Sequence, residues 1–274
     1  TMKRLINLSP TPVTRVFIGL LPFVLLLLVY IVASDARLEA NPNDKLLPSF
    51  SQMGAAIDRM ALEPSKRSGD YVFWVDTASS LKRLGMGVAI AASVGLAIGL
   101  LTGALPVINA SMSPLLTVIS LIPPLAILPV LFIIFGLGEL SKVMLIVLGI
   151  TPFIARDLQR RTQEIPSEQL VKAQTLGANT SQIMVRVLLP QLMPKLIDAV
   201  RLSMGAGWLF LIAAEAIAST DGLGYRIFLV RRYMSMDVIL PYVAWITLLA
   251  FLFDWLLATL SRRLFPWNVQ GGNS

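Results

Sequence analysis

Long apolar runs separated by polar stretches recur along this chain of 274 residues. A helix needs about 20 mainly apolar residues to cross the hydrocarbon core of a bilayer, and six runs come close to that length. We expect one spanning helix in each run. The runs cover residues 14–33, 79–103, 113–135, 141–156, 196–218 and 239–260. This pattern predicts an all-α polytopic membrane protein with six transmembrane helices.

The first apolar run, Val16–Val32, follows the basic residues Lys3, Arg4 and Arg15, as a signal peptide would. The run has the length of a spanning helix, and no clear small-x-small cleavage pattern follows it. We therefore expect an uncleaved helix, with residues 1–34 forming an N-terminal segment that contains it.

A polar stretch, residues 35–78, separates the first two apolar runs. Within it Met53, Ile57 and Met60 recur at helical spacing after Phe50. The spacing predicts a short amphipathic helix that lies at the membrane interface. With the N-terminus inside, this stretch is extracytoplasmic.

Composition supports a membrane protein and excludes several kinds of chemistry. Charged residues make up 14% of the chain, whereas a soluble domain carries about 25%. The chain has neither cysteine nor histidine, which removes disulfides, thiol nucleophiles, imidazole bases and most zinc sites. A membrane-embedded enzyme is therefore disfavoured. We attribute the formal charge of +7 to topology and anionic lipid, with no nucleic-acid partner.

The polar stretch between the fourth and fifth runs, residues 157–195, is rich in helix signals. Pro166 and Glu168 suit a helix start, and Gly177 can end that helix in a left-handed turn. Asn179 can cap a second short helix, which we expect over residues 182–189.

Pro190 and Pro194 should stop that second helix before the fifth run. The stretch would then form a compact knob of two short helices at an angle. Such a knob could convert closure of a partner protein into rotation of the attached bundle. An ordinary amphipathic connector on the bilayer surface is the alternative.

Two intramembrane features point to a translocation path. Pro123 and Pro124 leave helix carbonyls without donors, which lipid does not tolerate unless protein or water covers them; a broken helix beside an aqueous path and a packed kink both fit. Glu215 lies in an apolar run, where an acid usually faces the bundle or a cavity. Two interpretations of Glu215 stay open: it is a gate residue, or it forms a structural ion pair with an arginine such as Arg226.

Hydroxyl and indole groups in the spans could donate to a passing oxyanion, although each alone is more often a packing residue. Asp254, in the last run, we interpret as a buried acid or an inter-helix partner. The candidate path residues are Ser120, Pro123, Pro124, Ser203, Trp208, Glu215 and Ser219.

The spacing of Ala173, Gly177, Leu189 and Pro190 resembles that of the EAA loop of ABC-importer permeases. Through this loop the membrane subunit binds its ATPase. The full pattern is Glu-Ala-Ala, three residues, Gly, nine residues, Ile-x-Leu-Pro. The chain departs from it at the first two places and at the isoleucine, with Val171, Lys172 and Val187.

Further motifs, spread in order over residues 76–267, resemble permeases of the nitrate/taurine/alkanesulfonate importer group. They are Ile122-Pro123-Pro124-Leu125-Ala126, Pro129, Phe135-Gly136, Gly138-Glu139, Ser141-Lys142, Gly205-Ala206-Gly207-Trp208, Ala213-Ala214-Glu215, Gly222-Leu223-Gly224 and Pro266-Trp267.

This resemblance implies the type I ABC-importer permease fold in a bacterial inner membrane. It implies a second copy of the permease, two cytoplasmic ATPases that hold ATP and Mg²⁺, and an extracytoplasmic substrate-binding protein. The chain would be a non-catalytic subunit without a cofactor; it has no Gly-x-x-x-x-Gly-Lys-[Ser/Thr] loop. The ATPase-coupling residues that it implies are Ala173, Gly177, Ala178, Val187, Leu189 and Pro190.

The implied function is passage of a small oxyanion, such as a sulfonate, taurine or nitrate, into the cytoplasm. Lys and Arg divide almost evenly between the two sides, so the positive-inside rule decides little; the loop's implied partner places both termini in the cytoplasm. The alternative is a stand-alone secondary transporter, for which only Glu215 and Asp254 are available as ionisable path groups. We divide the chain into residues 1–34, residues 35–78, a permease core at 79–267 with the coupling loop 157–195, and a tail at 268–274.

Overall fold

A computed structural model describes residues 11–42, 44–65 and 69–267. These residues form helices and connecting turns, with no strand among them. The ten N-terminal residues, which include Lys3 and Arg4, and the tail expected at 268–274 lie outside the described residues. The predicted all-α class is confirmed.

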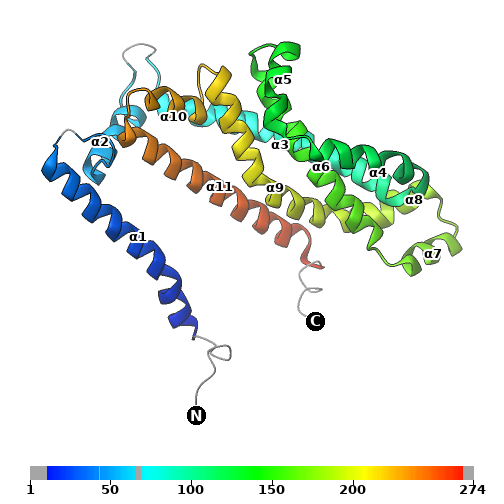
Figure 1. Cartoon of the computed structure of the whole chain (residues 1–274). Helices are drawn as coiled ribbons and strands as arrows, with labels where there is room; N and C mark the ends of the chain where they lie inside the picture. Colours follow the sequence, from blue (N-terminus) through cyan, green and yellow to red (C-terminus); the bar gives the residue numbers. More distant parts are fainter. Residues whose placement is uncertain (1–10, 43, 66–68, 268–274) are drawn as a thin grey trace.

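The first long helix, α1 (Pro12–Ala40), stands apart from the other long helices (Figure 1). Thr11 caps it by accepting a hydrogen bond from the backbone of Thr14. Its apolar side chains are largely exposed along its length, and two hydrogen bonds join it to the segment that follows: Tyr30 donates to the carbonyl of Pro48 at 2.6 Å and Ser34 to that of Leu47 at 2.9 Å. An apolar helix without protein neighbours is suited to lipid.

The amphipathic helix predicted between the first two runs is present as α2 (Phe50–Ala61). Ser49 and Gln52 form a reciprocal capping box at its start. Its apolar face, with Ala56 and Ala61 buried, packs against α3 and α11. Its placement at a membrane interface stays a prediction.

The centre of the bundle is the pairing of α3 (Val72–Ala104) with α6 (Glu139–Gln163). Glycines at four-residue intervals let the two backbones approach. A Cβ atom added to Gly95 would lie 2.7 Å from Ile154, and one added to Gly99 would lie 2.6 Å from Leu158. Close van der Waals contact is what holds helices together in lipid, so small residues mark the seam.

Two further long helices complete the bundle, joined by the short α10 (Leu223–Arg231) (Figure 1). Of these, α9 (Leu189–Ala218) packs against both α3 and α6, whereas α11 (Met236–Leu264) packs against α9, α10 and α2. The core consists mainly of aliphatic side chains from α6 and α9, with contributions from α2, α3, α5, α10 and α11. An aromatic cluster joins α3 to α11, in which Phe73 lies 5.4 Å from Tyr242 and 5.2 Å from Trp245, between ring centroids.

The expected count of six spanning helices is not confirmed. By length and composition, four helices of the described chain could cross a membrane, or five if one bent pair is a single span. The shortest predicted run, 141–156, lies within α6, whose apolar middle is flanked closely by charged residues such as Lys142 and Arg156.

The third predicted run, 113–135, is two helices rather than one. A turn of 3₁₀ helix, Pro124–Ile127, separates α4 (Pro106–Leu121) from α5 (Leu128–Phe135), and the two helices meet at 83°. Consecutive prolines remove two backbone donors and clash with the preceding turn, so the helix ends before them. The helix is therefore broken at this point, and the aqueous path beside the break stays a prediction.

The short helix expected over residues 182–189 does not end at Pro190, and that prediction was wrong. The chain passes from α8 (Thr180–Ile183) through one π-helical turn (Met184–Leu188) directly into α9, and Pro194 lies inside α9. The amide of Leu189 bonds to the carbonyl of Met184, five residues back. This wider turn shifts the hydrogen-bond register just before Pro190, so the helix continues through it.

Candidate functional site

A helical protrusion at one end of the bundle is the first candidate site. The helix α7 (Ser167–Thr175) leaves the end of α6 and lies at an angle to α9 (Figure 1). Pro166 immediately precedes it, as expected. Gln191 of α9 donates to Gln169 of α7 at 3.0 Å, which ties the protrusion to the long helix behind it.

Three residues of the EAA-like pattern form one C-terminal cap. Gly177 has φ +83°, which a residue with a Cβ rarely adopts. The amide of Ala178 donates to the carbonyl of Ala173 at 3.0 Å, and the amide of Gly177 to that of Gln174 at 2.9 Å. This pair of bonds is the Schellman motif. The motif satisfies the last carbonyls of α7 and fixes the direction in which the chain leaves it.

The next helix begins at once, with Asn179 as its cap. Asn179 and Gln182 form a capping box with bonds of 2.9 and 3.0 Å. The other pattern residues follow at the π-turn: Val187 and Leu189 are half-buried, and Pro190 is exposed. Capping hydrogen bonds on both sides of Gly177 therefore fix the turn between α7 and α8.

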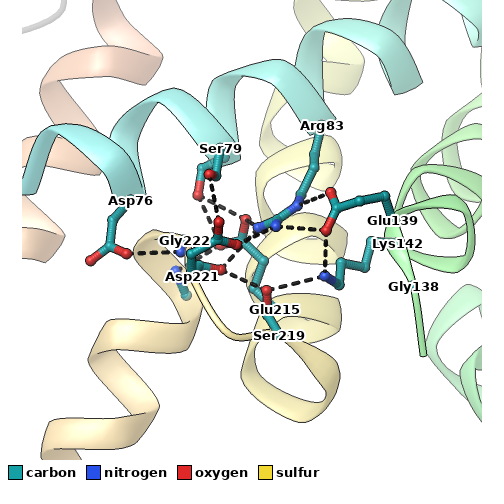
Figure 2. A network of polar contacts seen from close by, with 12 residues as sticks. Asp76, Ser79, Arg83, Gly138, Glu139, Lys142, Glu215, Ser219, Asp221 and Gly222 are labelled. Carbon is teal, nitrogen blue, oxygen red and sulfur yellow. Dashed lines mark hydrogen bonds and ion pairs between the residues drawn. The ribbon is translucent and has the colours of Figure 1, made fainter. Parts of the chain in front are cut away.

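A buried cluster of charges forms the second candidate site, near the other end of α9 (Figure 2). Glu215 is fully buried. Its carboxylate accepts bonds from Arg83 at 2.7 Å, from the hydroxyl of Ser80 at 2.8 Å and from the amide of Gly224 at 2.9 Å. Such an acid needs this many donors because an unpaired buried charge is very costly.

Arg83 is the hub of this cluster and contacts three carboxylates (Figure 2). Besides Glu215, its Nε donates to Glu139 at 2.6 Å and its Nη2 pairs with Asp221. Lys142 adds a second cation, with bonds to Glu139 at 2.8 Å and to Ser219 at 3.1 Å. The guanidinium fork therefore cross-links α3, α6 and the turn between α9 and α10.

A second ion pair extends the cluster along α3. Asp76 is fully buried and accepts from Arg226 at 2.7 Å, from the amide of Gly222 at 2.9 Å and from Tyr242 at 3.2 Å. Gly222, with φ +116°, brings its amide close to the carboxylates. The expected pairing of Glu215 with Arg226 was wrong, because Asp76 holds Arg226 and Arg83 takes Glu215.

Sequence reasoning missed Arg83 and Asp76 as members of the cluster. Their partners lie more than a hundred positions away in the chain, at Glu215 and Arg226. The available signal was a pair of opposite charges, Asp76 and Arg83, close to the start of the second apolar run. They lie about two turns apart on α3, with Ser80 between them. Charges at such a place need partners, but the sequence does not say which.

Asp221 lies in the turn outside the long helices, and its pKa is lowered. Burial by itself would raise the pKa of this carboxyl, but hydrogen bonds from Arg83 and Ser79 outweigh burial. Asp221 is therefore ionised whenever the cluster is intact at neutral pH.

The other predicted path residues lie in four separate places. Ser219 joins the charge cluster with Glu215, Pro123 and Pro124 form the break after α4, and Ser120 lines a hollow of about 520 Å³ between α4 and α6. Ser203 and Trp208 are buried in the core. Ser203 donates to a carbonyl of its own helix, and the indole N–H of Trp208 has no partner among the described residues. Their role in a path stays a prediction.

Asp254 pairs with Arg201 of α9 at 2.8 Å and is about half-exposed. It is an inter-helix partner rather than a buried acid. No group of three or more carboxylates that could hold a metal ion occurs among the described residues.

Apolar spans, a stiff protrusion and a cross-linked polar cluster together define the membrane component of a transporter. The chain belongs to the family of binding-protein-dependent transport system inner membrane components, whose model matches residues 95–266.

Individual relatives agree with this membership. The chain is 35% identical over 201 residues to the taurine transport system permease protein TauC of Escherichia coli, covering 73% of each chain. It is 30% identical to the bicarbonate transport system permease protein CmpB of Synechococcus elongatus, covering 70% of this chain and 69% of CmpB. It is 28% identical to the putative aliphatic sulfonates transport permease protein SsuC of Bacillus subtilis, covering 69% and 68%.

The fold is also that of a solved transporter. A chain of the MetNI methionine ABC transporter in an inward-facing conformation superposes with a TM-score of 0.63, over 73% of this chain and 98% of that chain, at 20% identity. The predicted type I importer permease fold is confirmed. The chain is a multi-pass permease subunit of an ABC transporter, a non-catalytic component whose ATPase and binding protein are other chains.

Proposed function

We propose that this permease passes a small oxyanion, such as a sulfonate, taurine or nitrate, from an extracytoplasmic binding protein into the cytoplasm. The similarity to permeases named for taurine, aliphatic sulfonates and bicarbonate carries this proposal. The named solutes share a sulfonate or carbonate group, an anion with several equivalent oxygens.

Coupling to the ATPase runs through the α7 protrusion, the EAA-like loop of this chain. When ATP and Mg²⁺ close the ATPase dimer, the partner pulls on Ala173, Gly177 and Ala178, and α9 transmits the movement through Val187, Leu189 and Pro190. The continuous helix from Thr180 to Ala218 supports this proposal, because a movement at its start reaches Glu215 near its far end without crossing a flexible joint. The loop and both termini then face the cytoplasm.

The transporter contains two copies of the permease in this proposal, and the passage lies between them. Lipid covers α1, whose apolar residues are largely exposed in a single chain. The path residues Ser120, Pro123, Pro124, Ser203, Trp208, Glu215 and Ser219 then line or support the passage. The Arg83–Glu215 cluster fixes the positions of the surrounding helices relative to one another at the outer end of the passage.

Uptake into proteoliposomes tests this function. The permease is reconstituted with its co-purified ATPase, with the binding protein outside and ATP on the ATPase side, and uptake of radiolabelled taurine, nitrate, bicarbonate and methanesulfonate is measured. We expect uptake of at least one of these that stops without ATP. Uptake by the permease alone, driven by an ion gradient, would establish the secondary transporter instead.

A further inference from the structure

The hollow between α4 and α6 contains, besides Ser120, polar groups that the proposed path does not include. One wall is a row of hydroxyls on α4, at Ser113, Thr117 and Ser120, and the opposite wall includes Arg156 and Arg160 of α6. The three hydroxyls recur at intervals of four and three residues, so they share one helix face. The row covers about 10 Å along the axis and leads toward the break at the consecutive prolines that follow α4.

The charges around this hollow leave an excess of positive charge. Asp157, the carboxylate among the lining residues, is held by Arg161 at 2.6 Å. Arg160 makes a looser and exposed pair with Glu164 at 3.5 Å, and such pairs contribute little. Arg156 has no ion pair or hydrogen bond within the described part of the chain. One guanidinium is therefore free to bind a ligand.

The hydroxyls suit an anion because they can redirect their protons. Thr117 and Ser120 donate to carbonyls one turn back in α4, at 2.9 and 2.6 Å. A helix carbonyl already has a backbone donor, so rotation of the hydroxyl toward a ligand leaves no buried group unpaired. The wall thus offers donors without fixed negative charge, and the guanidinium fork matches the oxygens of an oxyanion.

We propose that this hollow is an oxyanion-binding site in the passage, with Arg156 as its main cation. The proposal rests on the proposed function for the direction of transport, and it adds the residues that hold the solute. The hollow lies against the last turns of α6, from Phe153 to Gln163, and α6 leads into the coupling loop. The charge cluster around Glu215 could not serve, because its three carboxylates outnumber Arg83 and Lys142.

A free solute rather than a lipid headgroup is the proposed ligand. Gln159, which lies between the two arginines on α6, donates to Ser113 at 2.5 Å. The hydroxyl row continues along α4 from that point, so a diffusing anion can use each position in turn. A lipid phosphate would occupy one point near the membrane surface and leave most of the row unused. Both ligands share oxyanion chemistry, so the experiment must separate them.

The absence of cysteine from the chain allows a direct test of the charge in the hollow. Thr117→Cys places a single thiol of this chain there, in the permease–ATPase complex in phosphatidylcholine vesicles. This thiol is reacted with a sulfonate-bearing and with a trimethylammonium-bearing methanethiosulfonate. Each reaction rate is measured from the increase in mass of the modified peptide. The ratio of the two rates is divided by the same ratio for 2-mercaptoethanol.

We expect the sulfonate reagent to be favoured about tenfold after this correction, because a focused positive field concentrates anions. Arg156→Gln should bring the corrected ratio close to one. Arg263→Gln, which removes an exposed arginine at the end of α11, should leave it unchanged. A corrected ratio near one in the parent, a ratio that Arg156→Gln does not alter, or no reaction with either reagent would overturn the proposal.

Protection experiments separate the two ligand sources. Free taurine, nitrate or bicarbonate in millimolar amounts should slow the reaction, whereas phosphatidylglycerol added to the vesicles should not. The reverse result would assign the hollow to lipid and overturn the proposal. Because these rates require no transport, a permease that imports no oxyanion but keeps the rate ratio would refute the proposed function and leave the site standing.

Discussion

The guanidinium of Arg83 on α3 donates to the carboxylate of Glu215 on α9 at 2.7 Å, and both side chains are almost completely buried. The two residues are 132 positions apart in the chain. Their contact joins the start of the second apolar run to the end of the fifth. Because Arg83 also holds Glu139 and Asp221, removing it affects every element at this end of the bundle.

Arg83→Gln should therefore destabilise the protein strongly. It leaves Glu215 buried without its cation, and breaking a buried pair costs about 3–5 kcal/mol. Unfolding midpoints of the purified permease in detergent measure the effect. Arg59→Gln, which removes an exposed arginine 4.0 Å from Asp237, is the control and should change the midpoint little.

The double variant Arg83→Gln/Glu215→Gln tests the same contact. It removes the unpaired charge, so it should be more stable than Arg83→Gln alone. Strictly additive losses would mean that the two residues do not interact.

Gly177→Arg should leave the permease folded and abolish transport-coupled ATPase activity. An added Cβ at Gly177 meets no atom within 4 Å, so space is not the obstacle. The obstacle is the backbone conformation of Gly177, φ +83°, in which a residue with a Cβ is disfavoured by about 1–2 kcal/mol. Arginine would therefore change the angle at which the chain leaves α7. ATPase activity stimulated by the loaded binding protein is the measurement.

Gly177→Asn is the matched variant, because asparagine tolerates the left-handed region. It should keep most of the coupling. Full coupling in Gly177→Arg would refute the assignment of α7 as the lever.

Gly99→Ala should destabilise the α3–α6 pair. The new methyl group would lie 2.6 Å from Leu158 and 2.8 Å from the carbonyl of Ala155, and such overpacking costs about 1–3 kcal/mol. Gly85→Ala on the same helix meets nothing within 4 Å and should be neutral or slightly stabilising. Equal unfolding midpoints for the two variants would argue against the observed seam.

Stability should fall in acid because of Asp221. Its pKa is lower in the folded protein than in the unfolded chain, so the unfolded state binds the proton more readily. The stabilisation is complete above the unfolded pKa of about 4, and is lost as the pH falls from there through the lower folded value. Unfolding midpoints from pH 7 to pH 3 should drop less in Asp221→Asn than in the parent; parallel curves would exclude this contribution.

Local sequence patterns determine where many helices of this protein form and end. The apolar runs that became α1, α3, α9 and α11 were visible as lengths of hydrophobic residues, because burial in lipid depends on composition. The end of α7 at Gly177 and the cap at Asn179 were visible too, because a few neighbouring residues make those bonds. The resemblance of ordered motifs then led to the family.

Tertiary structure alone decided the partners and the bends. The cation that pairs with Glu215 is decided by how α3 packs against α9. Arg83 is that cation, and the expected partner, Arg226, pairs instead with Asp76. The prolines after Ile122 predicted a disturbance, but packing set the angle of 83°. Pro190 was read as a stop, yet a π-turn carries the helix through it. Local patterns determine where helices form and end, whereas contacts between distant residues depend on energies that no single segment contains.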